Sequence, residues 1–135
     1  SNQARELAIR GQKVTLVGAN ELWFINGLIL ERLRAIINKA DPNSAIVVMA
    51  HNPDLIYELA SDKLDLFLTG HTHGGQVRLP FIGALGDSEN KLPKKFYKGL
   101  SQWGQTRMFV TSGIGESGFG VRFFNPPQID ILEVK

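Results

Sequence analysis

Short apolar runs alternate with an amphipathic segment along the first half of the chain. Three runs, at 14–17, 45–50 and 64–69, are bounded by turn residues and have the length of buried strands. Between the first two, apolar residues recur at helical spacing from Leu28 to Ile37, and Asp41-Pro42 closes that pattern. Pro53 favours the start of a short helix over 54–59. This alternation predicts an α/β fold.

The second half predicts strands separated by long loops. Residues 76–79 are expected to form a strand that Pro80 stops, and 108–111 and 129–134 two later strands. The segment 81–103 is longer than most structureless loops, so it is a candidate lid or specificity segment, or else a folded loop with a small core of its own. The glycine-rich stretch 112–120 favours a flexible connection over a phosphate cradle, because the Lys-Ser/Thr ending of such cradles is absent.

All three histidines of the chain follow predicted strands. His51 comes directly after 45–50, and His71 and His73 lie in a glycine-flanked loop after 64–69. In an open α/β sheet, ligands bind at the carboxyl ends of the strands. Neutral imidazole is also the commonest metal-ligating side chain. The pattern favours a shared metal site over three solvent-facing histidines.

Composition narrows the class of protein. With 135 residues and 43% hydrophobic content, the chain can form the core of one domain or of a piece of one. The net charge of +2 is too balanced to predict nucleic-acid binding, and the absence of cysteine excludes disulfides and thiolate metal sites. No apolar run has the length of a membrane span, and the first residues lack a signal-peptide pattern.

One basic cluster stands out, formed by Lys91, Lys94, Lys95 and Lys98. It can be read as a solvated loop. It can also be read as a contact surface for a phosphate-bearing substrate or an acidic lipid headgroup. Both interpretations stay open from the sequence.

Several short motifs together resemble one known family. They are Gly-His-Thr-His-Gly-Gly-Gln at 70–76, Ala-His-Asn-Pro-Asp at 50–54, Thr-Ser-Gly-Ile-Gly at 111–115, Val-Arg at 121–122 and Asn-Pro-Pro at 125–127. In this order, and over nearly the whole chain, they resemble the C-terminal half of calcineurin-like metallophosphoesterases. The similarity is greatest to the bacterial branch that includes membrane-associated phosphodiesterases and UDP-2,3-diacylglucosamine pyrophosphatases.

The resemblance implies a fold and a chemistry. The fold would be α/β, as the C-terminal half of a four-layer α/β/β/α sandwich with a mixed sheet. The centre would hold two divalent ions (Mn, Fe or Zn), with His51 and His71 on the second ion and His73 on the first. A metal-bound hydroxide would then hydrolyse a phosphodiester or pyrophosphate bond. Arg122 and Asn52 are candidate contacts to this phosphate-ester substrate, which can be lipid-linked.

The family also requires an Asp-x-His motif, a bridging aspartate and an Asn-His-Asp/Glu segment, and this sequence contains none of them. We therefore expect residues 1–135 to be the C-terminal portion of a longer phosphoesterase domain whose N-terminal half is missing. Alone, it should bind one metal ion or none, lack activity, and associate with itself through an uncovered apolar sheet face. The alternative is a non-catalytic metal-binding or interaction module. The resemblance implies a bacterial protein located in the cytoplasm or at the periphery of the inner membrane.

Overall fold

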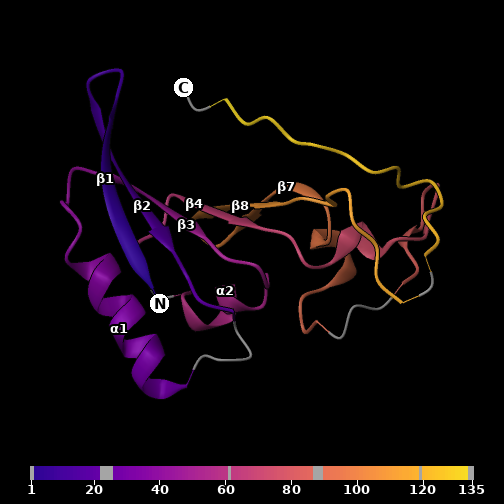
Figure 1. The fold of residues 1–135 in the computed structure, drawn as a ribbon, viewed down its shortest axis with the longest axis horizontal. Coiled ribbons are helices and arrows are strands. Elements are labelled where there is room, and N and C mark those ends of the chain that lie inside the picture. Colours follow the sequence, from indigo (N-terminus) through magenta and orange to yellow (C-terminus); the bar gives the residue numbers. More distant parts are fainter. Residues whose placement is uncertain (1, 22–25, 61, 87–89, 119, 134–135) are drawn as a thin grey trace.

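A six-stranded mixed sheet forms the centre of the structure, a computed structural model that describes residues 2–21, 26–60, 62–86, 90–118 and 120–133 (Figure 1). The order is β1-β2-β3-β4-β8-β7. The inner strands run parallel, and β1 and β7 lie antiparallel at the edges. Their bounds are β1 (Gln3–Ile9), β2 (Gln12–Gly18), β3 (Ala45–Met49), β4 (Leu66–Thr69), β7 (Gly99–Trp103) and β8 (Thr106–Val110). The predicted α/β class with a mixed sheet is confirmed.

Two helices, α1 (Gly27–Asn38) and α2 (Leu55–Glu58), cover one face of this sheet (Figure 1). The side chain of Asn26 caps α1 by accepting a hydrogen bond from the Ile29 N–H at 3.0 Å. Leu33 and Ile37 are the buried residues of α1, and they pack with every second residue of the inner strands. No helix among the described residues is both long and apolar enough to cross a membrane.

The other face of the sheet is apolar but only partly covered. Leu16, Val47 and Leu68 are half-buried there, and Met49 is exposed. A hollow of about 300 Å³ lies over this face, lined by Leu7, Ile9, Arg10, Gln12, Val14, Leu16, Ala45, Val47, Leu66, Leu68 and Leu132. A sheet of this class normally buries both faces of its parallel strands, so the uncovered face is where the isolated chain has unburied apolar surface.

The segment predicted as a long loop is largely folded. A short ribbon of β5 (Arg78–Leu79) and β6 (Gly83–Ala84) precedes the 3-10 turn η3 (Lys94–Phe96) and edge strand β7. Leu92 and Tyr97 are fully buried in the main core. The described part of 81–103 is therefore folded onto the body of the protein, but through the main core and not through a small core of its own. Its role as a specificity segment stays a prediction.

At the chain ends, one predicted strand is absent and one observed strand was not predicted. Residues 129–133 form no strand, because no neighbouring strand pairs with them and the side chains of Ile129 and Ile131 are exposed; Val134 lies outside the described residues. Strand β1 carries no extended apolar pattern, and its residues are exposed along its whole length. Only Leu7 and Ile9 alternate as large apolar residues, which is too short a pattern to predict a strand, and β1 forms through pairing with β2 across the Arg10-Gly11 turn.

A buried carboxylate fastens the folded segment to the body. Asp54, just before α2, accepts hydrogen bonds from the backbone N–H groups of Lys91 at 2.7 Å and Leu92 at 2.9 Å. Its side chain makes no capping hydrogen bond to α2. Asp54 instead ties 91–92 to the turn that follows His51.

Asp54→Asn is expected to lower the free energy of unfolding by about 1–2 kcal/mol, because a charge-assisted pair of hydrogen bonds becomes a weaker, partly mismatched one. Trypsin should also cleave after Lys91 faster. Urea denaturation and timed proteolysis measure the two effects. Glu31→Gln, at an exposed position of α1, is the control and should change neither. Equal behaviour of the two variants would contradict the fastening role.

Candidate metal centre

The three histidines lie at the edge of the sheet where its parallel strands end. The loops after β3 and β4 are joined there by backbone contacts. The carbonyl of His51 accepts from the Gly70 N–H at 3.1 Å and from the Thr69 hydroxyl at 2.6 Å. These bonds fix the position of His51 relative to the loop that carries His71, as expected from the predicted strand ends.

The side chains of His51 and His71 converge. His51 Nε2 lies 3.0 Å from His71 Nδ1, with the rings edge to face at 4.8 Å between centroids. This spacing suits a hydrogen bond between two imidazoles. It is also close enough for both nitrogens to ligate one ion. The pair can therefore share a proton or a cation.

A carboxylate that the sequence analysis did not select lies beside this pair. Glu21 Oε2 is 4.0 Å from His51 Nε2. Asp54 and Asp65 are closer to the histidines in the sequence, but the side chains of both accept backbone hydrogen bonds, Asp65 from the Ile46 N–H at 2.7 Å. Position along the fold could have found Glu21, because it follows β2, which lies next to β3 in parallel.

His73 is held in one tautomer by its surroundings. Its Nδ1 lies 2.9 Å from the carbonyl oxygen of Gly115. A carbonyl can only accept, so Nδ1 carries a proton, and in the neutral ring Nε2 is then the nitrogen that can ligate a metal. Metal-ligating histidines typically donate a hydrogen bond from their second ring N–H to a carbonyl or carboxylate in this manner. The His73 side chain is thus prepared to act as a ligand through Nε2.

The loop that bears these histidines has an unusual backbone. His71, His73 and Gln76 have φ values of +65°, +48° and +48°, in the left-handed region that non-glycine residues seldom adopt. Gly74 and Gly75 follow with φ of +63° and +78°. Such conformations cost free energy and concentrate at functional sites. This clustering is a second, independent indication that 71–76 is a functional loop.

Burial lowers the pKa of His71 below its ordinary value of 6.5, with the nearby His51 adding to the effect and Glu21 opposing it. His71 is therefore neutral at pH 7, the form that ligates metals. In the window between this lowered pKa and 6.5, the unfolded chain binds more protons than the folded chain, so stability should fall as the pH is lowered through it.

We expect the free energy of unfolding of the metal-free chain to drop more between pH 7 and about pH 5 than that of His71→Asn, which lacks the titrating ring. Urea denaturation at the two pH values gives both differences. Identical pH dependence in the two proteins would contradict the lowered pKa.

The two predicted substrate contacts lie close to the histidines but have partners of their own. The Arg122 guanidinium donates to the carbonyls of Ser112 and Gly115 and to that of Asn125 at 3.2 Å. Asn52 is buried, and its Oδ1 accepts from the Asp54 N–H at 2.9 Å. Both residues shape the loops around the centre, and their contact with substrate stays a prediction.

Within the described residues, no group of three or more histidine or acidic side chains is arranged to hold a metal ion by itself. The residues present fit a metal site in part: two converging imidazole nitrogens, a nearby carboxylate and a third, oriented imidazole. Imidazole and carboxylate together suit Zn²⁺, Fe or Mn²⁺. The chain offers part of a ligand set.

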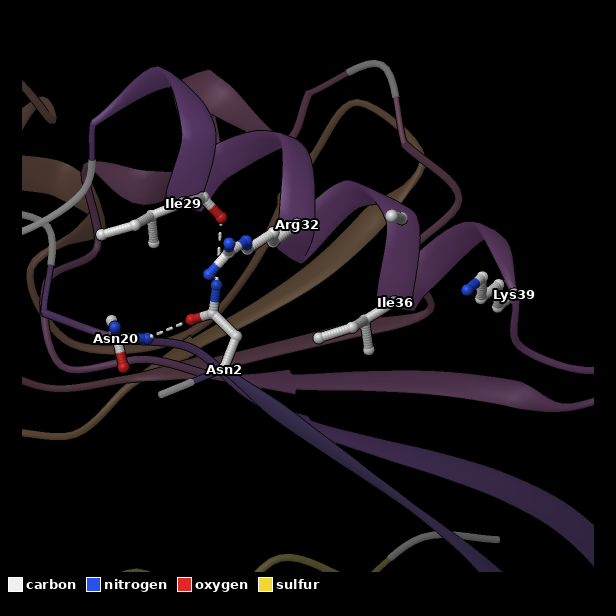
Figure 2. Close-up of a pocket in the computed structure, with 7 residues that line it drawn as sticks. Asn2, Asn20, Ile29, Arg32, Ile36 and Lys39 are labelled. Atoms are coloured by element: carbon white, nitrogen blue, oxygen red, sulfur yellow. Dashed lines mark hydrogen bonds between the residues drawn. The ribbon is translucent and has the colours of Figure 1, made fainter.

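A separate hollow of about 450 Å³ lies between α1 and the start of β1 (Figure 2). Its lining residues are Asn2, Asn20, Ile29, Arg32, Ala35, Ile36 and Lys39. Asn2 bridges its walls by accepting from the Asn20 N–H at 2.8 Å and donating to the Ile29 carbonyl at 3.1 Å (Figure 2). None of the histidines lines this hollow, so it is not part of the candidate centre.

Imidazoles gathered at the carboxyl edge of a mixed α/β sheet are typical of metal-dependent hydrolases. Comparison with known proteins narrows the class. The chain is 33% identical to the phosphodiesterase YaeI of Escherichia coli over 98% of its own length and 46% of that protein. It is 37% identical to the metallophosphoesterase Cj0846 of Campylobacter jejuni over 90% of its length and 32% of that protein.

A third relative is the UDP-2,3-diacylglucosamine pyrophosphatase LpxG of Chlamydia muridarum, 32% identical over 68% of the chain and 30% of that protein. No protein-family model and no solved structure matches the chain. The chain belongs to the metallophosphoesterase family, as the resemblance of its motifs implied. It spans less than half the length of these relatives.

Proposed function

We propose that this chain supplies histidine ligands to the centre of a metal-dependent phosphoester hydrolase that acts on phosphodiester or pyrophosphate bonds. The observation that carries the proposal is the convergence of His51 Nε2 and His71 Nδ1 at 3.0 Å on the carboxyl edge of the sheet. The names of the relatives, a phosphodiesterase and a pyrophosphatase among them, support this reaction class.

In this proposal the centre holds two divalent ions in the complete enzyme, with His51 and His71 on one ion and His73 on the other. Such ions polarise a phosphoryl oxygen and lower the pKa of a water molecule. The chain's own residues would hold the ions and orient the ligating side chains. Gly115 fixes the tautomer of His73 through its carbonyl, and Arg122 donates to that same carbonyl. Arg122 and Asn52 would also order the substrate phosphate.

The chain alone is not expected to turn over substrate, because the motifs that supply the other ligands in the family are absent from residues 1–135. Activity is therefore best tested in a chimera in which this chain replaces the matching portion of YaeI. The chimera is expected to hydrolyse a chromogenic phosphodiester with added Mn²⁺. The rate should fall by about 100-fold or more in its His73→Ala variant, because loss of a residue that only hydrogen-bonds a metal ligand already lowers metal affinity or activity by about 10–100-fold.

Arg10→Asn, which changes an exposed residue of the β1–β2 turn, is the matched control in the chimera and should keep its activity. Circular dichroism and metal content of each purified protein separate loss of the fold from loss of the centre. A folded chimera that binds metal and remains as active after His73→Ala would refute the proposal. A folded chain that binds metal while its chimera hydrolyses nothing would favour the alternative, a non-catalytic metal-binding module.

The uncovered sheet face supports a second part of the proposal, that the isolated chain associates with itself. Leu7 and Ile9 at one edge and Leu100 on β7 add exposed apolar side chains to the half-buried ones of the inner strands. Pairing two such faces would remove this surface from water. Sedimentation velocity should show a dimer or larger species that Leu7→Lys shifts toward monomer, whereas a monomer at all concentrations would contradict it.

A further inference from the structure

An apolar tip projects from the turn between β5 and β6. Phe81 is fully exposed, Ile82 is 70% exposed, and Phe124 beside them is 65% exposed. Phe124 is tied to this ribbon by its neighbour Phe123, whose backbone pairs with both Gln76 and Arg78. We refer to Phe81, Ile82 and Phe124 as the apolar tip.

The backbone of the apolar tip is strained without any gain in packing. Phe81 has φ of +66° and Phe124 has φ of +48°, a region in which a bulky residue is a rare exception. Asparagine or glycine would fit both positions at lower cost. Since the two rings bury little surface in the protein, folding gives no reason for their presence. A strained and exposed aromatic residue points to a function outside the folded core.

Two basic side chains lie beside the apolar tip. Lys95 and Arg78 line the same hollow of about 560 Å³ as Phe81, Ile82 and Phe124. Lys91 and Lys94 of the same segment are also exposed. Between residues 78 and 98 the sequence carries five basic residues against two acidic ones, Asp87 and Glu89. Large apolar side chains with a basic surround are the composition of a surface that binds anionic lipid headgroups.

We propose that the apolar tip docks on a bilayer that contains anionic phospholipids, with Phe81 and Ile82 entering the headgroup region and Lys95 contacting lipid phosphates. A protein partner fits this surface less well, because a stable protein interface needs on the order of 1,000 Å² of complementary area and a two-residue turn offers a small convex one. A bilayer accepts a convex tip without shape complementarity.

The apolar tip is built onto the loop of the candidate centre. Arg78 Nη1 donates to the carbonyl of Gly74 at 2.9 Å, one residue after His73. Gly75 lies against Ala84 of β6, since a Cβ built on this glycine would come within 2.5 Å of the Ala84 Cβ. Docking would therefore hold the histidine loop at the membrane surface. In that position the centre would face phosphoesters carried by lipids, an inference that rests on the proposed function.

Vesicle co-sedimentation tests the docking, in EDTA and without substrate, so that the outcome does not depend on the metal or on turnover. The chain is expected to bind vesicles of mixed phosphatidylcholine and phosphatidylglycerol, and to bind pure phosphatidylcholine vesicles much less. The Phe81→Asn/Ile82→Thr variant should bind about tenfold or more weakly, since two large apolar side chains are removed. Lys95→Gln should weaken binding about fivefold, and added salt should weaken it further.

Phe81→Asn suits the left-handed backbone at this position, so the variant should fold at least as well as the parent. Leu28→Ser removes another exposed apolar side chain, 57% exposed on α1, and is the control for general hydrophobicity. In Phe81→Trp, tryptophan emission should shift to the blue on adding vesicles and be quenched by lipids brominated in their acyl chains.

Failure of the parent chain to bind mixed vesicles would overturn the docking proposal, as would binding that the tip variants leave unchanged. Loss of self-association in Phe81→Asn/Ile82→Thr, with no vesicle binding by the parent, would assign the tip to a protein interface instead. Hydrolysis of a soluble phosphodiester by the YaeI chimera is measured without lipid, so the reaction and the docking can fail separately.

Discussion

His71→Asn is expected to weaken Zn²⁺ binding by the chain by about 100-fold or more, because the substitution removes one of the two imidazole nitrogens that converge at 3.0 Å. Asparagine is chosen because it tolerates the left-handed backbone at this position, where φ is +65°. The side chain, not the loop conformation, is then what changes. Isothermal titration near neutral pH measures the affinity, where His71 is neutral in the parent chain.

Arg10→Asn is the matched control for this experiment. Arg10 also has a left-handed backbone, with φ of +51°, and is exposed in the turn between β1 and β2, away from the histidines. Its replacement should leave the Zn²⁺ affinity unchanged. If His71→Asn binds Zn²⁺ as tightly as Arg10→Asn does, the paired imidazoles share a proton and not a metal ion.

Gly75→Ala is expected to lower the free energy of unfolding by about 2–4 kcal/mol, through two costs that add. Gly75 has φ of +78°, where a residue with a side chain is strained. The added methyl group would also lie 2.5 Å from the Ala84 Cβ, so β6 would have to move away from the histidine loop. Urea denaturation measures the difference in the free energy of unfolding, provided that its dependence on urea concentration is the same in both proteins.

Gly11→Ala separates the two costs. Gly11 has nearly the same backbone, with φ of +80°, but no atom lies within 4 Å of the position of an added Cβ. It should lose about 1 kcal/mol from backbone strain alone. A loss at Gly75 no greater than that at Gly11 would show that the histidine loop and β6 are not packed as the structure has them.

Local patterns were sufficient for the elements that bury apolar residues. The runs that became β3 and β4 are continuous apolar segments because both sides of an inner parallel strand are surrounded by protein. The helix from Gly27 to Asn38 was found by its spacing and its closing Asp41-Pro42. The histidines could be assigned to one edge because parallel strands end on the same side.

Features that depend on a partner could not be read from the sequence. Strand β1 has no buried face and exists through its pairing with β2, and 129–133 has an alternating pattern but pairs with no described strand. Asp54 accepts from a segment that lies 37 residues away in the sequence, so no local rule reveals it. Glu21 approaches His51 only because β2 and β3 are neighbours in the sheet. In each case the structure of the segment, or the position of the side chain, is determined by a tertiary contact.

The order of strands also has a consequence for how the protein folds. The groups around the centre come from the ends of β2, β3 and β4 and from Gly115 after β8, and pairs such as Leu66 with Arg107 are far apart in sequence. Closing such long connections slows folding, because chain entropy is lost before the strands gain their contacts. A short peptide with the His-Thr-His segment would therefore not reproduce the centre. During refolding, tight binding of a metal ion should therefore appear late. Its appearance would mark the time at which the connections between β2, β3 and β4 are complete.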